Sequence, residues 1–264
     1  MDKQLLERKF GLMGARLKVG PLVRRWRMGR SIDAPITLDV RSDRTGEFFE
    51  ILMRDADVEM TVLDVRPELR HLLLMAPVGK FLCGHDERHW FAAAVPGNAS
   101  NVKTALVALK PEAVRLEETR KRVRTRDRLH RRNDAFIRQG EWFFVPAPEL
   151  EPKRLLIMRN EPLSRGGGSK PHMCEYIYRT GGQTVYVSRE RPTGINEAQY
   201  HKLITRNPGA KSWDWRVMRR GMQVYARGRV WHPDHKSIHL HCWHEVFMNR
   251  ENEAPARGNL VFLD

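Results

Sequence analysis

Residues 225–249, YARGRVWHPDHKSIHLHCWHEVFMN, alternate between apolar and polar side chains on both sides of a short polar break. A period of two is typical of β-strands that are covered on one face, and Pro233 with Asp234 provides a turn between two of them. The sequence therefore predicts a β-hairpin. Its apolar face is formed by Val224, Ala226, Gly228, Val230, Ile238, Leu240, Cys242, Val246 and Met248, with His244 among them as a hydrogen-bonded core histidine.

The opposite face of this hairpin combines arginine, histidine and aromatic side chains: Tyr225, Arg227, Arg229, Trp231, His239, His241, Trp243, Glu245 and Phe247. A turn centred between Pro233 and Asp234 predicts the cross-strand pairs Arg229 with His239, Arg227 with His241, and Tyr225 with Trp243. Three interpretations of this face compete. It is a platform on which bases stack and phosphates bind, a metal site, or a second packing layer of aromatic pairs.

The metal interpretation depends on the histidines and on one cysteine. Zinc is bound by neutral imidazole and by thiolate, and a catalytic zinc needs about three protein ligands and an open position. The predicted set is His172, Cys174, His239 and His241, with Glu245 as the base of a metal-dependent hydrolase or nuclease. For the pair on the second strand alone, the alternative third ligands are Glu245, His232, His235 and His172. Two arginines opposite that pair oppose a dication, and the spacing matches no zinc finger or ribbon.

The formal net charge of +15 over 264 residues favours a polyanionic partner. Nucleic acid is the usual soluble polyanion, and an anionic membrane surface or an acidic subunit of a larger assembly are the alternatives. No apolar run is long enough to cross a bilayer, and the opening residues MDKQLLERKF lack an apolar signal core, so we expect a cytoplasmic protein that is not in a membrane. The odd cysteine count predicts no disulfide framework.

The densest run of positive charge lies within residues 114–138 and consists of Arg120, Lys121, Arg122, Arg124, Arg126, Arg128, Arg131 and Arg132. Weak apolar periodicity makes a helix plausible there. The segment is either a solvated connector between domains or an element that tracks a phosphate backbone. Arginine outnumbers lysine, which favours bidentate phosphate contacts over solubility alone.

Four shorter segments suggest further functional groups. Trp213, Trp215, Arg216, Arg219 and Arg220 mix rings and guanidinium groups, which suits base stacking or cation–π packing. The predicted turn GHDERHW, residues 84–90, holds His85, Asp86, Glu87 and His89 and is either an acid–base cluster or an exposed turn. The glycine-rich SRGGGSKPH, residues 164–172, lacks the phosphate-loop pattern and is expected to be a flexible loop. Trp26, among the arginines of residues 24–30, belongs to a basic arm or to a nucleic-acid contact.

The chain as a whole predicts an α+β protein of two mainly antiparallel β-rich halves joined by a basic helical segment. Residues 1–112 form the first half and contain one helix at 98–112, residues 113–138 form the basic helical connector, and residues 139–264 form the second half. Within the first half, ELRHLLLMA at 68–76 fits either a strand or a short helix.

No catalytic signature is decisive, and the function that the sequence favours is nucleic-acid binding, to RNA or single-stranded DNA. Zinc is a possible cofactor, and the alternatives are the metal-dependent hydrolase and the basic subunit of an assembly. The residues expected to contact nucleic acid are Arg120, Arg122, Arg124, Arg126, Arg128, Arg131, Arg132, Trp213, Arg219, Arg220, Tyr225, Arg227, Arg229, Trp231 and Trp243.

Overall fold

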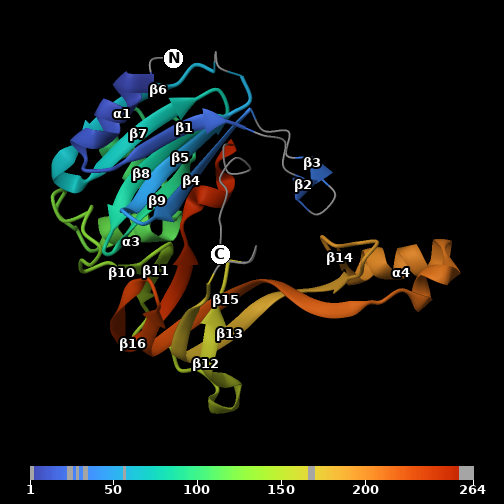
Figure 1. The fold of residues 1–264 in the computed structure, drawn as a ribbon. Helices are drawn as coiled ribbons and strands as arrows, with labels where there is room; N and C mark the ends of the chain where they lie inside the picture. Colours follow the sequence, from blue (N-terminus) through green and yellow to red (C-terminus); the bar gives the residue numbers. More distant parts are fainter. Residues whose placement is uncertain are drawn as a thin grey trace.

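The computed structural model describes residues 3–22, 26–27, 30–31, 35–55, 58–165 and 170–255. It confirms the α+β class and the two β-rich halves (Figure 1). The arginines at positions 24 and 25, and the glycine-rich run 166–169, lie outside the described residues, and so do the surroundings of the Trp26 side chain. No helix within the described ranges is long and apolar enough to cross a bilayer.

The described part of the N-terminal half contains two larger sheets, a separate two-stranded ribbon and two α-helices. Its elements are α1 Lys3–Leu12, β1 Leu17–Pro21, β2 Trp26–Arg27, β3 Arg30–Ser31, β4 Ile36–Asp43, β5 Gly46–Met53, β6 Thr61–Arg66, β7 His71–Ala76, β8 Gly79–Asp86, β9 His89–Val95 and α2 Val102–Ala108. One sheet has the order β1-β5-β4, with β1 parallel to β5, and the other is the antiparallel meander β6-β7-β8-β9. Both contribute side chains to one core, in which Phe10 of α1, Phe49 and Phe81 are fully buried.

The ambiguous segment 68–76 is a strand preceded by a 3-10 turn, Pro67–Leu69. Its sequence is a continuous apolar run because β7 is covered on both faces. Leu72 and Leu74 belong to the core between the sheets, whereas Leu73 belongs to a second core beneath α2. The helix expected within residues 98–112 is α2, and the side chain of its N-cap, Asn101, accepts the N–H of Thr104 in a capping box.

The basic segment between the halves is helical only at its start. Helix α3 spans Glu112–Arg120, and turns follow it up to the short strand β10, Ile137–Gln139. Arg122 has a φ of 50°, in the left-handed region, and its N–H bonds the carbonyl of Thr119. A left-handed residue at this point ends α3 and turns the chain back, so that Val123 packs with Phe136 in a small core.

The C-terminal half is built around one antiparallel sheet with the order β10-β11-β16-β15-β13-β12. Its further elements are β11 Trp142–Pro146, β12 Ile157–Leu163, β13 His172–Val187, β14 Ile195–Asn196, α4 Glu197–Arg206, β15 Arg216–His232 and β16 His235–Met248. The predicted hairpin is the pair of β15 and β16, and its predicted apolar face packs in the core of this half, where Ala226, Val230 and Leu240 are buried.

The predicted register of this hairpin is correct near the turn and wrong farther away. Arg229 lies opposite His239 as predicted, but Tyr225 lies opposite Glu245 rather than Trp243. The cause is a β-bulge between Ala226 and Gly228, where Gly228 has a φ of 81°. Glycine reaches this backbone conformation without strain, and the bulge shifts the pairing by two residues, which preserves the faces.

Strands β13 and β15 extend well beyond the rest of their sheet. Pairing with the neighbouring strands β12 and β16 reaches only Tyr178 of β13 and Tyr225 of β15, while β13 and β15 continue to pair with each other as far as Val187 and Arg216. Beyond Tyr178 and Tyr225 the short strand β14 also pairs with β13. We call residues 183–220 the arm. In Figure 1 the arm extends to the right of the lower half and carries β14 and α4 at its far end.

Candidate functional site

The far end of the arm is held together by its own aromatic side chains. Tyr186 of β13 stacks on Tyr200 of α4 with the ring centroids 4.2 Å apart, and Trp215 meets Tyr200 edge-on at 5.1 Å. Trp213, which the sequence predicts as a base-stacking residue, is half-buried and stacks on Trp215 at 5.6 Å. The rings therefore form a small core that fixes α4 on the ribbon, and Trp213 lies at its edge.

The arm exposes nearly all of its charge. It contains eight basic residues, all exposed, and three acidic ones, Glu190, Glu197 and Asp214. The basic residues are Arg189, Arg191, Lys202, Arg206, Lys211, Arg216, Arg219 and Arg220. Two of them also support the backbone: Arg219 donates to the carbonyl of Gly181 at 3.2 Å, and Arg220 to the carbonyls of Thr193 and Gly194.

The aromatic face of the predicted hairpin is largely a packing layer. Tyr225 and Trp243 are only 9% and 5% exposed and form a cluster with Tyr178, against which Leu150 and Ile157 pack. Bases therefore have no access to these two rings, because other side chains already cover them. Arg227 is exposed and lies over Trp243, with its guanidinium carbon 5.3 Å from the ring centroid.

Closer to the hairpin turn, two of the predicted contact residues remain available. Arg229 is exposed and lies over the ring of the half-buried Trp231, with its guanidinium carbon 5.5 Å from the centroid. Its backbone N–H donates to Glu175 at 2.8 Å, which anchors the strand at the bulge. This end of the hairpin therefore presents an arginine and a partly accessible ring.

The connector uses part of its positive charge inside the molecule. Arg131 pairs with Asp86 and, at 2.6 Å, with Glu87 of the N-terminal half. Arg128 donates to the carbonyl of Val123 at 3.1 Å, and Arg120 pairs with Glu117 at 2.6 Å. Arg126 lies 3.8 Å from Asp127. The exposed arginines of the connector, besides Arg120 and Arg126, are Arg122, Arg124 and Arg132.

The turn between β8 and β9, residues 84–90, joins the two halves. Its two histidines do not converge: His85 meets the ring of Trp90 edge-on, and His89 bonds Glu47 at 2.7 Å. Its acidic side chains bind the connector, and Glu87 also accepts the backbone N–H of Lys236 at 2.7 Å. The turn therefore contacts both the connector and the C-terminal half.

The predicted metal set is not brought together. Cys174 is buried in the apolar core, and burial raises the pKa of its thiol to about 12, which disfavours the thiolate that a metal needs. His239 and His241 are exposed on β16, and their ring centroids lie 4.9 Å apart. Burial raises the pKa of Glu245, which lies opposite Tyr225 in the pairing of β15 with β16.

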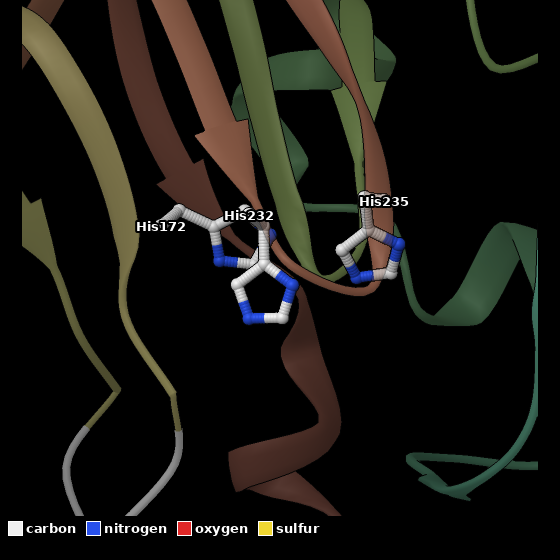
Figure 2. Close-up of side chains that lie close together, drawn as sticks. All are labelled: His172, His232 and His235. Atoms are coloured by element: carbon white, nitrogen blue, oxygen red, sulfur yellow. The ribbon is translucent and has the colours of Figure 1, made fainter.

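The fourth member, His172, lies instead beside two other histidines (Figure 2). His172 begins β13, His232 ends β15 and His235 begins β16, so the last two face each other across the hairpin turn. The ring of His172 stacks on His232 with centroids 4.3 Å apart and on His235 at 5.3 Å. The spacing H-x-x-H across a two-residue turn is the sequence signal for this pair, since such a turn places both ends side by side.

This histidine cluster lines a cavity of about 530 Å³ between the two halves. The N-terminal half contributes Asp39, Glu47 and His89 to its walls, and the C-terminal half contributes the three histidines. Burial raises the pKa of Asp39 to about 6, although Arg41 lies 2.8 Å away. A cavity with convergent polar side chains and shifted pKa values has the features of a ligand site.

The three histidines differ in their surroundings. Burial lowers the pKa of His172 to about 3 and that of His235 to about 4, so both rings are neutral at pH 7. His172 is 1% exposed, and among the described residues neither of its ring nitrogens has a hydrogen-bond partner. His232 accepts the backbone N–H of Asp234 on Nδ1 at 3.1 Å.

Comparisons with known proteins found no family model, no curated protein and no solved structure that this chain matches.

Proposed function

We propose that this chain binds nucleic acid and that the arm, residues 183–220, is its main contact. The observation that supports this most is that eight basic side chains are exposed on the arm, a two-stranded ribbon with α4 and loops at its end that extends beyond its sheet. A projecting ribbon of this kind reaches a long polyanion without steric hindrance from the body of the protein. Each phosphate that it neutralises releases counterions, which provides the free energy of binding.

The arm fits a phosphate backbone better than it fits an acidic or lipid surface. A membrane-bound or obligate protein interface needs a contiguous apolar patch. The exposed apolar residues of the paired strands in the arm include Val217 and Met218, which are 66% and 52% exposed. They are neighbours on one strand, so their side chains point to opposite faces and do not form one patch.

The preference for RNA or single-stranded DNA is part of the proposal and is supported by fewer residues than the sequence suggests. Tyr225 and Trp243 are buried, which leaves Trp213 and Trp231 as partly accessible rings, and the exposed Arg229 lies over Trp231. Stacking on such rings favours unpaired bases, whereas phosphate contacts alone accept duplex and single strands alike. Base stacking is worth about 1–3 kcal/mol per base, so even two rings are sufficient for a measurable preference.

Fluorescence anisotropy with labelled RNA, single-stranded DNA and duplex of equal length tests the proposal. The expected result is binding that weakens steeply with salt, with a slope of log K against log salt of about −0.7 per contacted phosphate for a single strand. Failure to bind any of the three at low salt would refute nucleic-acid binding. Tighter binding to duplex at every salt concentration would refute the single-strand preference alone.

A further inference from the structure

We propose that His172, His232 and His235 bind a divalent transition-metal ion of the zinc type, with an open coordination position toward the cavity between the two halves. The three rings come from the adjacent ends of β13, β15 and β16, so the sheet itself brings them together (Figure 2). The cluster is separate from the arm, and the inference does not depend on nucleic-acid binding.

The ring nitrogens lie close enough together to converge on one metal ion. One nitrogen from each ring can be chosen so that all three lie within 4.8 Å of one another. Zinc binds imidazole nitrogen at about 2.0–2.1 Å, so tetrahedral ligation requires nitrogens about 3.4 Å apart. Ligation therefore requires the rings to turn toward one another.

Gly140 keeps a space open between two of the rings. A Cβ at this position would lie 2.8 Å from Nε2 of His235 and 3.1 Å from Nε2 of His172, so these two nitrogens converge on the same small volume. Gly140 has a φ of 57° in the turn between β10 and β11, a conformation that glycine adopts freely. Any larger residue would occupy the space beside these two nitrogens.

The burial of His172 provides an independent reason for a ligand. An imidazole that is 1% exposed and lacks partners on both nitrogens among the described residues has lost its hydrogen bonds to water. Leaving a buried polar group unpaired costs about 1–3 kcal/mol. A metal ion takes up the lone pair of one ring nitrogen and so provides a partner that the described residues do not supply.

His232 differs from the other two because its Nδ1 already accepts the N–H of Asp234. The ring therefore carries its proton on Nε2, and ligation through Nδ1 requires loss of that backbone bond. The carboxylate of Asp234 lies 3.9 Å from the same nitrogen and 3.3 Å from the ammonium of Lys170. We therefore expect His232 to contribute less to affinity than His172 or His235.

The surroundings indicate which ligand would occupy the open position. Three imidazole ligands do not compensate the charge of a bound dication, so the open position favours an anionic or oxygen ligand. Arg131 and Arg165 near the rings are paired with Glu87 and Glu251, so the ion itself rather than these arginines provides the attraction. Hydroxide, carboxylate or phosphate oxygens are the chemical class that fits, and a bound water would be acidified as at other three-histidine zinc sites.

Metal binding by the full chain tests this directly. Protein stripped with a chelator is titrated with Zn²⁺ in competition with a chromophoric chelator, and with Co²⁺ followed by its visible absorption. The expected result is one ion per chain for the unchanged protein. His172→Ala should weaken binding by more than about 100-fold, which exceeds the 10- to 100-fold typical for loss of an outer hydrogen-bond partner. The double substitution of His239→Ala and His241→Ala, on the exposed face, should leave affinity unchanged.

A pair of glycine substitutions separates loss of the site from loss of the fold. Gly140→Ala places a methyl group between the two Nε2 atoms, and Gly97→Ala introduces the same left-handed strain, at a φ of 70°, where no atom lies within 4 Å. The former should lose the ion and the latter should keep it. Circular dichroism of each variant reports whether it folds. Absence of a stoichiometric ion in the unchanged protein, or its retention in both His172→Ala and Gly140→Ala, would overturn the proposal.

Discussion

The connector and the arm are both strongly basic, yet they expose their charge to different degrees. In the connector, Arg131 is paired with two carboxylates of the N-terminal half, and Arg128 bonds a backbone carbonyl. In the arm, all eight basic side chains are exposed. The density of arginine along a sequence therefore does not show how much charge is available to a partner. The available charge depends on whether each basic side chain is paired in the fold.

The largest effect that we expect concerns a buried ion pair between Lys110, which precedes the connector, and Glu118 of the connector. Lys110 is 4% exposed, and its ammonium group lies 2.6 Å from Glu118 and also bonds the carbonyl of Arg128. Lys110→Met leaves the buried carboxylate without its counter-charge, which should reduce the free energy of unfolding by about 3–5 kcal/mol. Thermal or urea unfolding measures the change.

The double substitution of Lys110→Met and Glu118→Leu is the matched control. It removes both charges together, so most of the lost stability should return. If Lys110→Met alone were as stable as the unchanged protein, the charges of this pair would contribute no more to stability than the exposed charges of the arm.

Removal of the arm should give the next largest effect. Gln183 pairs with Arg220, so residues 184–219 can be replaced by Asn-Gly, which forms a two-residue hairpin turn at that point. The sheet core around Ala226 and Leu240 lies outside the removed residues. We expect nucleic-acid affinity at low salt to fall by about 100-fold or more, with folding retained. An affinity within a few-fold of the unchanged protein would exclude the arm as the main contact.

Neutralisation of equal numbers of charges in the two regions gives a sharper test. Lys202, Arg206 and Lys211 of the arm are changed to Gln in one variant, and in the other the three connector arginines at positions 122, 124 and 126 are changed. Each phosphate that a variant no longer neutralises should reduce the salt slope by about 0.7 to 0.9. The arm variant should bind roughly tenfold more weakly at low salt, and the connector variant should change less than about threefold. Equal losses of affinity would show that both regions bind the nucleic acid.

The hairpin of β15 and β16 was predictable from the sequence only in part. Period-two alternation predicted the hairpin and its faces, because burial of one face determines the identity of every second residue. The bulge at Gly228, which shifts the pairing, was not predictable, because a backbone irregularity leaves no periodic pattern in the sequence. The rings of Tyr225 and Trp243 were interpreted as a binding surface because the residues that cover them, such as Leu150, are far away in the sequence.

The histidine cluster illustrates the same limit. His232 and His235 are close in the sequence, so a tight turn between them was predictable. His172 joins them only because β13 pairs with β15, a contact between residues about sixty positions apart. Patterns of charge and alternation report on a single strand or helix, whereas a site assembled from several strands depends on the order of strands in the sheet.

The smallest effect that we expect comes from an exposed ion pair of the connector. Arg120 donates to both carboxylate oxygens of Glu117 on the surface of α3, and this lowers the pKa of Glu117. The unfolded chain therefore binds a proton more readily than the folded chain near pH 4.5, and the stabilisation is present above that pH and is lost as the pH falls. Glu117→Gln should reduce the free energy of unfolding at pH 7 by no more than about 0.5 kcal/mol, and the difference should vanish at acidic pH. If Glu117→Gln lost as much free energy of unfolding as Lys110→Met, then ion pairing itself, rather than burial of the pair, would determine how much these charges stabilise the fold. Urea unfolding of both proteins at two pH values measures this difference.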